Sequence, residues 1–523
     1  MMVNSIQSTG SVFNVNAQKV KKQEKAEVNN QQTEQKPVVA ADGNATKAYI
    51  LGGTRAAAKK PQDPIKAWVN SLPFADDLSP EDKRNLGNVI RKNDQETDYM
   101  KKMIHLVCKK MVTPFATTSL CKHGQMSELA KSDIDTYYDK VKEQGMSIKD
   151  AFVPEAASQK EGQETAKVGD VFRVAGQDNI YVKNGDNESK QLKMDADTYL
   201  KLFPPVERYA ACQGGNGDCY FLSSVNAIME NPYSRTAVYD CFTQNGNDVE
   251  VKFPNGKVSE NCPNAKLPKG ADISKYTDGP MGMKLLEYTY GKDVEAQRFE
   301  QYDEIVSKEF KKMDKDLKKW EKKTPQDDLA LKKQKEIKKR IENWKTGQAQ
   351  FEEMRNNPNN TKVLIEDDNC DLVIGKFGPM FEEVSKVDSD YKNPHEFYLG
   401  GLGGYADPVM ETFGFVSETV ETDVDEDYID EVLNAKDTNE YIIAAATYPE
   451  EEGEMESPQE KSYSIYSSHE YKIIPFDDEN GQRMFKVTNP WNQSHRVIMG
   501  ADKVKEFFAD FSIVKVKQDD QQA

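Results

Sequence analysis

The strongest chemical signal in the chain is the segment Ala211-Cys212-Gln213-Gly214-Gly215-Asn216-Gly217-Asp218-Cys219-Tyr220. Its three glycines allow a tight loop and the close approach of another backbone. Asp218 is predicted to cap a helix whose apolar positions follow, so Cys219 falls in the first helical turn. The helix dipole and the free amide groups there favour the thiolate, which is the nucleophilic form of cysteine.

Two groups are predicted to donate to a developing oxyanion: the backbone amide of Cys219 and the side-chain amide of Gln213, six residues upstream. A lone cysteine at a helix start is usually structural. The glycine-rich loop and Gln213 favour a catalytic role in this case. The remaining cysteines have no such setting, and for them a buried or inert role is preferred: Cys108, Cys121, Cys212, Cys241, Cys262 and Cys370.

A thiolate nucleophile needs a base and a group that orients the base. His469 opens a strand-like run, and Asn489 follows twenty residues later. Glu479-Asn480-Gly481 between them predicts a hairpin turn, so two antiparallel strands bring His469 and Asn489 together. Asn489 then accepts a hydrogen bond from one imidazole nitrogen while the other faces the sulfur. Trp491 is predicted to pack over this pair and limit water.

The other histidines carry weaker signals. His123 lies near Cys108 and Cys121, but the loose spacing of these three residues is a weak indication of zinc, and metal ligands stay unassigned. The remaining histidines give no catalytic signal: His105, His395 and His495.

These residues resemble the calpain (C2) family of cysteine peptidases. The run from Gln213 to Tyr220 resembles the family's nucleophile motif, with Tyr where Trp is more usual. Asn489-Pro490-Trp491 resembles the family's Asn-Pro-Trp. The resemblance covers about residues 204–515 without the segment 293–355. Three further stretches resemble family segments in the same order: 283–290, 400–404 and 497–511.

The resemblance implies an α+β fold with a papain-like, two-lobed core. A helical lobe would hold Cys219, and a β-rich lobe would hold His469 and Asn489. It also implies endopeptidase activity on protein substrates through this Cys-His-Asn triad and an acyl-enzyme. Gly403 and Trp491 are expected at the substrate-binding surface. No cofactor is required for the chemistry, and calcium is left open as a structural activator.

Residues beside His469 depart from the family pattern. Ser468 stands where Gly is usual, and Glu470 stands where a small residue is common. A carboxylate beside the base is expected to alter its pKa or the width of the cleft. The segment 423–427 has the opening spacing of a calcium loop, but Tyr428 stands where Gly is needed, so a solvated acidic loop is predicted.

Composition and periodicity divide the chain into segments. Residues 1–60 have hardly any aromatic side chains to bury, so a disordered tail is predicted. Two helical stripes between 293 and 355 flank Thr324-Pro325, which predicts an inserted helical hairpin. The other predicted segments are a helical domain (61–160), a small β unit (165–203), a calpain-like peptidase domain (204–515) and a tail (516–523).

The composition argues against several classes of protein. A formal net charge of −18 argues against nucleic acid or an anionic membrane as the main partner. No stretch approaches the roughly 18 consecutive apolar residues of a membrane span, and the polar N-terminus shows no secretory signal. Seven scattered cysteines do not resemble a disulfide framework. A cytoplasmic location is expected, with export by a signal-less route as the alternative, and a bacterial source is weakly favoured.

Three functions stay open. The first is an active endopeptidase. The second is a catalytically silent scaffold of the same fold, in which the hairpin at 293–355 or the N-terminal domain binds a partner. The third is acyl transfer as in transglutaminases, but those enzymes favour Asp in the orienting role, and Asn489 favours a peptidase. The intact catalytic set favours the first function, because nothing else requires all of its members.

Overall fold

The computed structural model describes residues 128–516, except 210, 324–327, 368–369, 402, 450–457, 461–462, 464 and 492–495, together with Asn70, Lys83, Tyr99, Lys102, Met103, His105, Leu106 and Val112. The predicted tail at 1–60, the turn at Pro325 and the tail from 517 lie outside the described residues. Most of the predicted helical domain before residue 128 does so too. The chain mixes helices and sheets, which confirms the α+β part of the predicted fold class.

Contacts divide the chain into two units, which are described separately. The larger unit comprises Val69–Gln301 and Glu383–Ala523, and the smaller comprises Met1–Trp68 and Tyr302–Glu382. No helix within the described residues is long and apolar enough to cross a membrane.

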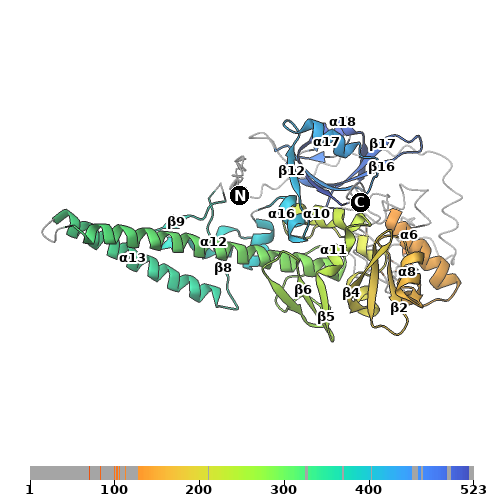
Figure 1. Cartoon of the computed structure of the whole chain (residues 1–523), viewed down its shortest axis with the longest axis horizontal. Coiled ribbons are helices and arrows are strands. Elements are labelled where there is room, and N and C mark those ends of the chain that lie inside the picture. Colours follow the sequence, from red (N-terminus) through yellow and green to blue (C-terminus); the bar gives the residue numbers. More distant parts are fainter. Residues whose placement is uncertain are drawn as a thin grey trace, which may run out of the picture. The chain divides into compact units, whose positions relative to one another are not determined.

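An antiparallel six-stranded sheet in the larger unit carries the C-terminal part of the chain (Figure 1). The predicted turn at Glu479-Asn480-Gly481 joins two of its strands, and Gly481 adopts a φ of 77° there. Apolar side chains such as Ile473 and Phe485 form the core between this sheet and helices α17 (Glu426–Leu433) and α18 (Ala501–Phe507). In sheet order the strands are β12 (Glu418–Glu421), β19 (Phe508–Lys515), β13 (Tyr441–Thr447), β16 (Glu470–Asp477), β17 (Arg483–Thr488) and β18 (Arg496–Met499).

A second sheet of the larger unit has seven strands in chain order. The strands predicted at 165–203 do not form a unit of their own, because Lys193 of β4 pairs with Thr243 of β5. Their apolar side chains, Ile180 among them, share one core with the helix that follows Cys219. The strands are β1 (Glu155–Ala156), β2 (Val171–Val174), β3 (Asn179–Gly185), β4 (Glu188–Asp195), β5 (Phe242–Asn245), β6 (Asp248–Lys252) and β7 (Ser259–Cys262).

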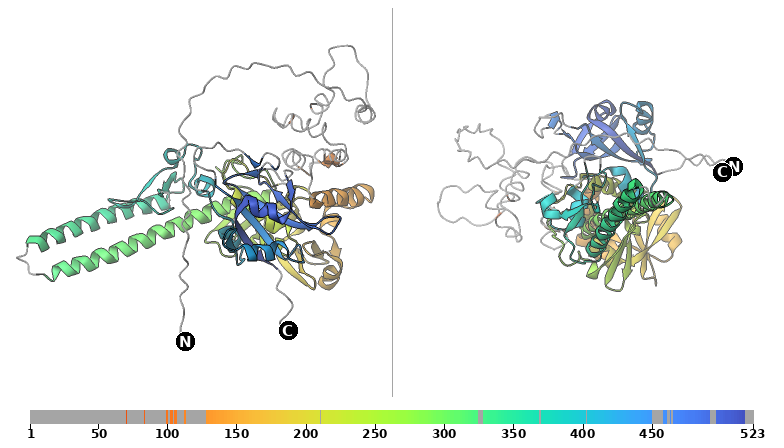
Figure 2. Two further views of the ribbon diagram at one scale, coloured as in Figure 1. Left: turned by 90° about the horizontal axis from the view of Figure 1, so that it is seen from above. Right: turned by 90° about the vertical axis from the view of Figure 1, so that its left-hand side faces the viewer.

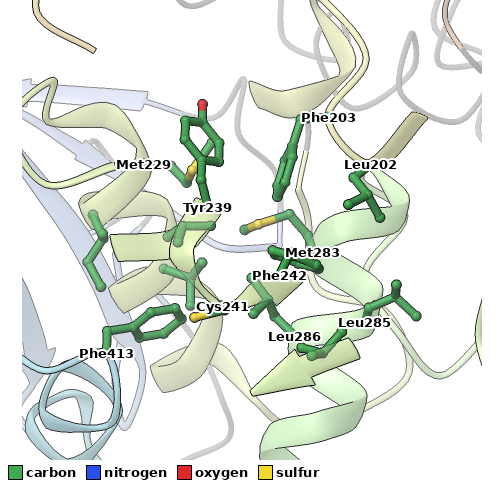
Figure 3. Packing of buried hydrophobic residues seen from close by; sticks show 14 of the residues in the cluster. Leu202, Phe203, Met229, Tyr239, Cys241, Phe242, Met283, Leu285, Leu286 and Phe413 are labelled. Atoms are coloured by element: carbon green, nitrogen blue, oxygen red, sulfur yellow. The ribbon is translucent and has the colours of Figure 1, made fainter. Parts of the chain in front are cut away.

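Among the helices of the larger unit, several contribute apolar side chains to one large cluster. Figure 3 shows Cys241 and Tyr239 packed among Phe242, Met283 and Leu286. The burial of Cys241 agrees with the inert role predicted for it. The helices are α6 (Glu128–Thr136), π-helix η2 (Tyr137–Glu143), α7 (Ile148–Phe152), α8 (Gln159–Thr165), α9 (Ala196–Leu202), η3 (Glu207–Tyr209), α10 (Cys219–Glu230), α11 (Arg235–Asp240), η4 (Pro263–Ala265), α14 (Val384–Val387), α15 (Pro394–Glu396), π-helix η5 (Phe397–Gly401) and α16 (Ala406–Thr412).

The predicted helical hairpin is present, and Figure 2 shows its two helices running side by side. Helix α12 (Met281–Glu321) starts earlier than predicted, within the larger unit, and α13 (Asp328–Arg355) follows it. In the smaller unit Tyr302 stacks on Phe351 with ring centroids 3.6 Å apart. Near the other end of the hairpin, the side chain of Gln334, early in α13, donates to the carbonyl of Trp320, at the end of α12, so the helices are antiparallel. Short strands complete the unit: β8 (Lys362–Leu364) pairs with β11 (Phe381–Glu383), and β9 (Ile374–Gly375) with β10 (Gly378–Pro379).

Candidate active site

Cys219 is the first residue of helix α10, as the sequence predicts. Asp218 lies at the N-cap position, but its side chain makes no capping hydrogen bond, so that part of the prediction is wrong. The carboxyl is fully buried and lies against the carboxyl of Glu287 on α12. Burial raises the pKa of Asp218 to about 7 and raises that of Glu287 well above its usual range. The two acids therefore share at least one proton near neutral pH.

The loop before Cys219 is held from several sides. The backbone N–H of Gln213 donates to the carbonyl of Pro490 at 2.8 Å, which ties this loop to the segment after β17. The Gln213 side-chain amide donates to the Asn216 carbonyl at 2.6 Å. That amide carries a second N–H, which keeps it available as an oxyanion donor.

Gly400 and Gly404, from the predicted glycine-rich segment, lie directly against the loop and helix start around Cys219. A Cβ on Gly217 would lie 2.6 Å from the carbonyl oxygen of Gly400, so only glycine fits there. Tyr220 adds a hydrogen bond of 2.8 Å from its hydroxyl to the Leu399 carbonyl. Gly403 has a φ of 69°, is exposed, and faces open space on the side where a Cβ would stand. Its backbone is therefore free to meet a ligand.

His469 and Asn489 meet as predicted. His469 directly precedes β16 and Asn489 directly follows β17, and the antiparallel pairing of these strands places both residues at one end. The distance from His469 Nε2 to Asn489 Oδ1 is 3.0 Å. Because an amide oxygen only accepts, Nε2 is assigned the proton and Nδ1 keeps the lone pair.

Trp491 covers the imidazole, which is the packing predicted from the sequence. Its ring centroid lies 4.3 Å from that of His469, and its backbone N–H donates to Asn489 Oδ1 at 2.9 Å. Asn489 Oδ1 thus meets both the histidine and the tryptophan. The indole remains 45% exposed, so it offers a surface to a ligand as well as a cover for the base.

Hydrogen bonds to the backbone of Glu470, the residue after His469, connect the start of the helix that carries Cys219 to the strand that follows His469. The backbone N–H of Glu470 donates to Cys219, and the hydroxyl of Ser223 donates to the Glu470 carbonyl at 3.0 Å. Helix α10 packs along β16 at this point. The structure thus brings together Cys219, His469 and Asn489, which are separated by up to 270 residues in the sequence.

Cys219 and His469 are both shielded from solvent: His469 is buried and Cys219 is partly buried. Burial raises the pKa of the Cys219 thiol to about 12, despite the backbone hydrogen bond from Glu470, and the carboxyls of Glu470 and Asp218 add to the shift. Burial lowers the pKa of His469 to about 4, against the opposing effect of its hydrogen bond to Asn489. Both groups are therefore neutral at pH 7. This differs from the predicted thiolate, because desolvation outweighs the helix dipole.

The two unusual neighbours of His469 have structural consequences. Ser468 adopts a φ of 49°, a left-handed conformation that glycine adopts at lower free-energy cost. Glu470 is only 5% exposed, and burial raises the pKa of its carboxyl to about 8, with further contributions from Asp510 and Asp407. The carboxylate expected beside the base is therefore mostly protonated at neutral pH.

Metal sites receive no support from the described part of the chain. Within it, no group of three or more His, Cys, Asp or Glu side chains is placed to hold a metal ion. Tyr428 lies inside helix α17, which begins at Glu426, so the acidic segment at 423–427 is not a calcium loop. The cysteines and histidine considered for zinc lie outside the described residues, as does His495. His105 contacts the ring of Tyr138, and His395 is packed against Tyr288.

Sequence reasoning assigned no role to two residues of this region, Ser223 and Glu287. Ser223 lies one helical turn after Cys219, and this i, i+4 spacing was the available signal. Glu287 lies in the stretch 283–290 that resembles a family segment, but nothing local indicates its pairing with Asp218. No protein-family model matches this chain, and no curated protein matches it in sequence.

Proposed function

We propose that the chain is a cysteine endopeptidase with a calpain-like, papain-type two-lobed core. The observation that carries the proposal is the 3.0 Å contact from His469 Nε2 to Asn489 Oδ1, beside a sulfur that accepts the adjacent Glu470 amide. Nucleophile, base and orienting amide come from distant parts of the chain. A structural role for any one of them would not require the other two.

The reaction starts from a neutral thiol and a neutral imidazole. As Cys219 Sγ attacks a peptide carbonyl carbon, its proton moves to Nδ1 of His469, and Asn489 holds the ring in place. The carbonyl oxygen gains negative charge and accepts hydrogen bonds from the Cys219 amide and the second N–H of Gln213. The C–N bond then breaks, and the imidazolium gives its proton to the leaving amine.

Hydrolysis of the resulting thioester completes the cycle. A water molecule gives a proton to His469 Nδ1 and attacks the acyl carbon, the C–S bond breaks, and the proton returns to Cys219. The exposed backbone at Gly403 and the indole of Trp491 are proposed to contact the substrate on either side. Calcium stays a proposed structural activator. The described residues contain no cluster of three or more His, Cys, Asp or Glu side chains for a metal ion, and no step of this reaction runs through calcium.

The proposal is tested with the purified full chain and an unfolded protein substrate, with calcium or with a chelator. We expect fragments from the native chain and none from Cys219→Ala. Cys370→Ser is the matched control, because Cys370 is an exposed thiol, and it should cut normally. Cleavage that persists in Cys219→Ala would refute the assigned nucleophile. No cleavage by any protein in any condition would favour the catalytically silent scaffold.

A further inference from the structure

One side of helix α12 in the smaller unit consists of lysines. The opposite side carries the apolar stripe of the hairpin, in which Phe310 lies against Trp344 of α13 with ring centroids 6.4 Å apart. Helical spacing places every third or fourth residue on one side. From 308 to 322, each position directly opposite the apolar stripe is an exposed lysine: Lys308, Lys311, Lys312, Lys315, Lys318, Lys319 and Lys322.

The lysines continue around the end of the hairpin, where α12 stops and α13 begins. The bond of 3.1 Å from Gln334 to the Trp320 carbonyl holds the last turn of α12 beside the second turn of α13. Exposed lysines of both helices therefore lie at the same end. We call this group the lysine tip: Lys318, Lys319, Lys322, Lys323, Lys332 and Lys335.

This arrangement is unfavourable for the hairpin on its own. Lysines four residues apart on a helix repel each other, as Lys315 and Lys319 or Lys318 and Lys322 do. A solvated helix normally places acids at this spacing. Within the described chain, however, Lys318 is the only member of the tip that forms an ion pair, with Asp314. A charge pattern that opposes local stability indicates a binding function.

The tip is positive although the formal net charge of the chain is −18. Lys322 lies about 30 Å along α12 from Tyr302, at 1.5 Å per residue. This is several times the screening length of about 8 Å at physiological salt. Acids near Tyr302, such as Asp303, therefore do little to weaken the attraction between the tip and an anionic surface. The total charge, which argues against an anionic membrane as the main partner, does not describe this end of the hairpin.

Apolar side chains at the same end favour a lipid surface over a nucleic acid. Leu329 is 55% exposed and Leu331 is 50% exposed, both in the first turn of α13. Trp320 is partly exposed, and the Lys323 ammonium lies 4.4 Å from its ring centroid. Lysine, leucine and tryptophan together are typical of surfaces that bind anionic lipid headgroups and place apolar groups at the acyl boundary. Nucleic-acid surfaces favour arginine, and no arginine lies between Arg298 and Arg340.

We propose that the end of the hairpin of α12 and α13 docks on an anionic phospholipid surface. The lysine tip attracts the phosphate and carboxylate groups of the lipids, and Leu329 and Leu331 enter the boundary between headgroups and acyl chains. The contact is peripheral and reversible, because it combines a few charges with two apolar side chains. The inference does not depend on the proposed peptidase activity.

The test is sedimentation of the purified full chain with vesicles. We expect binding to vesicles of phosphatidylcholine mixed with phosphatidylserine, little binding to vesicles of phosphatidylcholine alone, and release as salt is raised to about 1 M. Neutralising three members of the tip should weaken binding on the order of a hundredfold: Lys319→Gln, Lys322→Gln and Lys332→Gln. Leu329→Ser with Leu331→Ser should weaken it on the order of tenfold. All five side chains are exposed, so circular dichroism should show unchanged helix content.

Matched controls separate the tip from total charge and from surface apolarity. Three exposed lysines outside the hairpin provide the charge control, Lys160→Gln, Lys252→Gln and Lys269→Gln, and two exposed apolar residues provide the other, Ile273→Ser and Val416→Ser. Neither control should change vesicle binding.

Three results would overturn the inference. The first is no preference for phosphatidylserine. The second is binding that the lysine variant and its control weaken equally. The third is a partner of another class: a duplex DNA, or a second copy of this chain detected by light scattering, that the lysine variant loses while the native chain ignores vesicles.

Discussion

Ser223 lies one helical turn after Cys219, and its hydroxyl donates a hydrogen bond of 3.0 Å to the carbonyl oxygen of Glu470, the residue after His469. This bond fixes the helix that holds the sulfur to the strand that holds the imidazole. Ser223→Ala is therefore expected to lower kcat on the order of tenfold with little change in KM, because the sulfur and Nδ1 lose their alignment. Ser223→Thr, which keeps a hydroxyl, should restore part of the rate.

The neighbouring serine provides a control for this effect. Ser224 is equally buried, and its hydroxyl donates to the Tyr220 carbonyl at 2.8 Å, away from the base. Both alanine variants should lose roughly 1 kcal/mol of folding free energy, since each loses one buried hydrogen bond. Only Ser223→Ala should lose activity. Equal losses of kcat in both variants would show that Ser223 acts through stability alone.

The contact between His469 and Asn489 was predictable because its causes are local. The turn at Glu479-Asn480-Gly481 and the alternating runs on either side define a hairpin, and a hairpin places its outer ends together. His469 and Asn489 stand at those ends. The hairpin of α12 and α13 was predictable for a similar reason, since apolar stripes repeat at helical spacing over many residues.

The environment of the site was not predictable, because the burial of each side chain depends on contacts with residues from distant parts of the chain. Asp218 has the sequence features of a helix cap, yet Glu287, far away in sequence, turns it into half of a buried acid pair. The same burial raises the pKa of Cys219, although its position at a helix start predicts the opposite. The strands at 165–203 were read as separate because no local signal shows that Lys193 pairs with Thr243.

The reactivity of the thiol gives a second prediction. With the pKa of Cys219 raised to about 12, alkylation by iodoacetamide should be slow at pH 7 and should rise steadily up to pH 10, because only the thiolate reacts. Exposed Cys370 serves as an internal reference within the same chain. Peptide mapping by mass spectrometry should find Cys219 labelled on the order of a hundredfold more slowly at neutral pH. A Cys219 rate that is already constant from pH 5 to 8 would contradict the neutral pair.

The third prediction concerns Glu470 and pH. Its folded-state pKa of about 8 lies above the ordinary value of 4.5, so the folded chain keeps this proton while the unfolded chain releases it. Wild-type stability should therefore fall relative to Glu470→Gln as pH rises from 4.5 to 8. The difference in unfolding free energy should reach a few kcal/mol by about pH 8, measured by denaturant titration. Glu479→Gln, exposed on the turn after the same strand, should show no such pH dependence, and a flat difference for Glu470→Gln would disprove the raised pKa.

The ion pair of Glu230 and Lys472 gives the last prediction, since it ties the end of α10 to β16. Burial alone would raise the pKa of Glu230, but Lys472 and Arg496 lower it to about 2. Lys472 is 3% exposed, so Glu230→Gln removes the ionised partner from a buried ion pair and should reduce the unfolding free energy by about 3 kcal/mol at pH 7.

Adding Lys472→Met to the Glu230→Gln variant should recover most of that loss, because an apolar side chain fills the same space without a charge. The lowered pKa makes the contribution of Glu230 complete above pH 4.5 and reduces it as pH falls toward 2, so wild type and Glu230→Gln should converge in acid. Glu506→Gln, which breaks the exposed pair with Lys503, should change stability by less than about 1 kcal/mol at any pH. If the double variant is no more stable than Glu230→Gln, the loss comes from packing around Glu230 rather than from the loss of the ion pair.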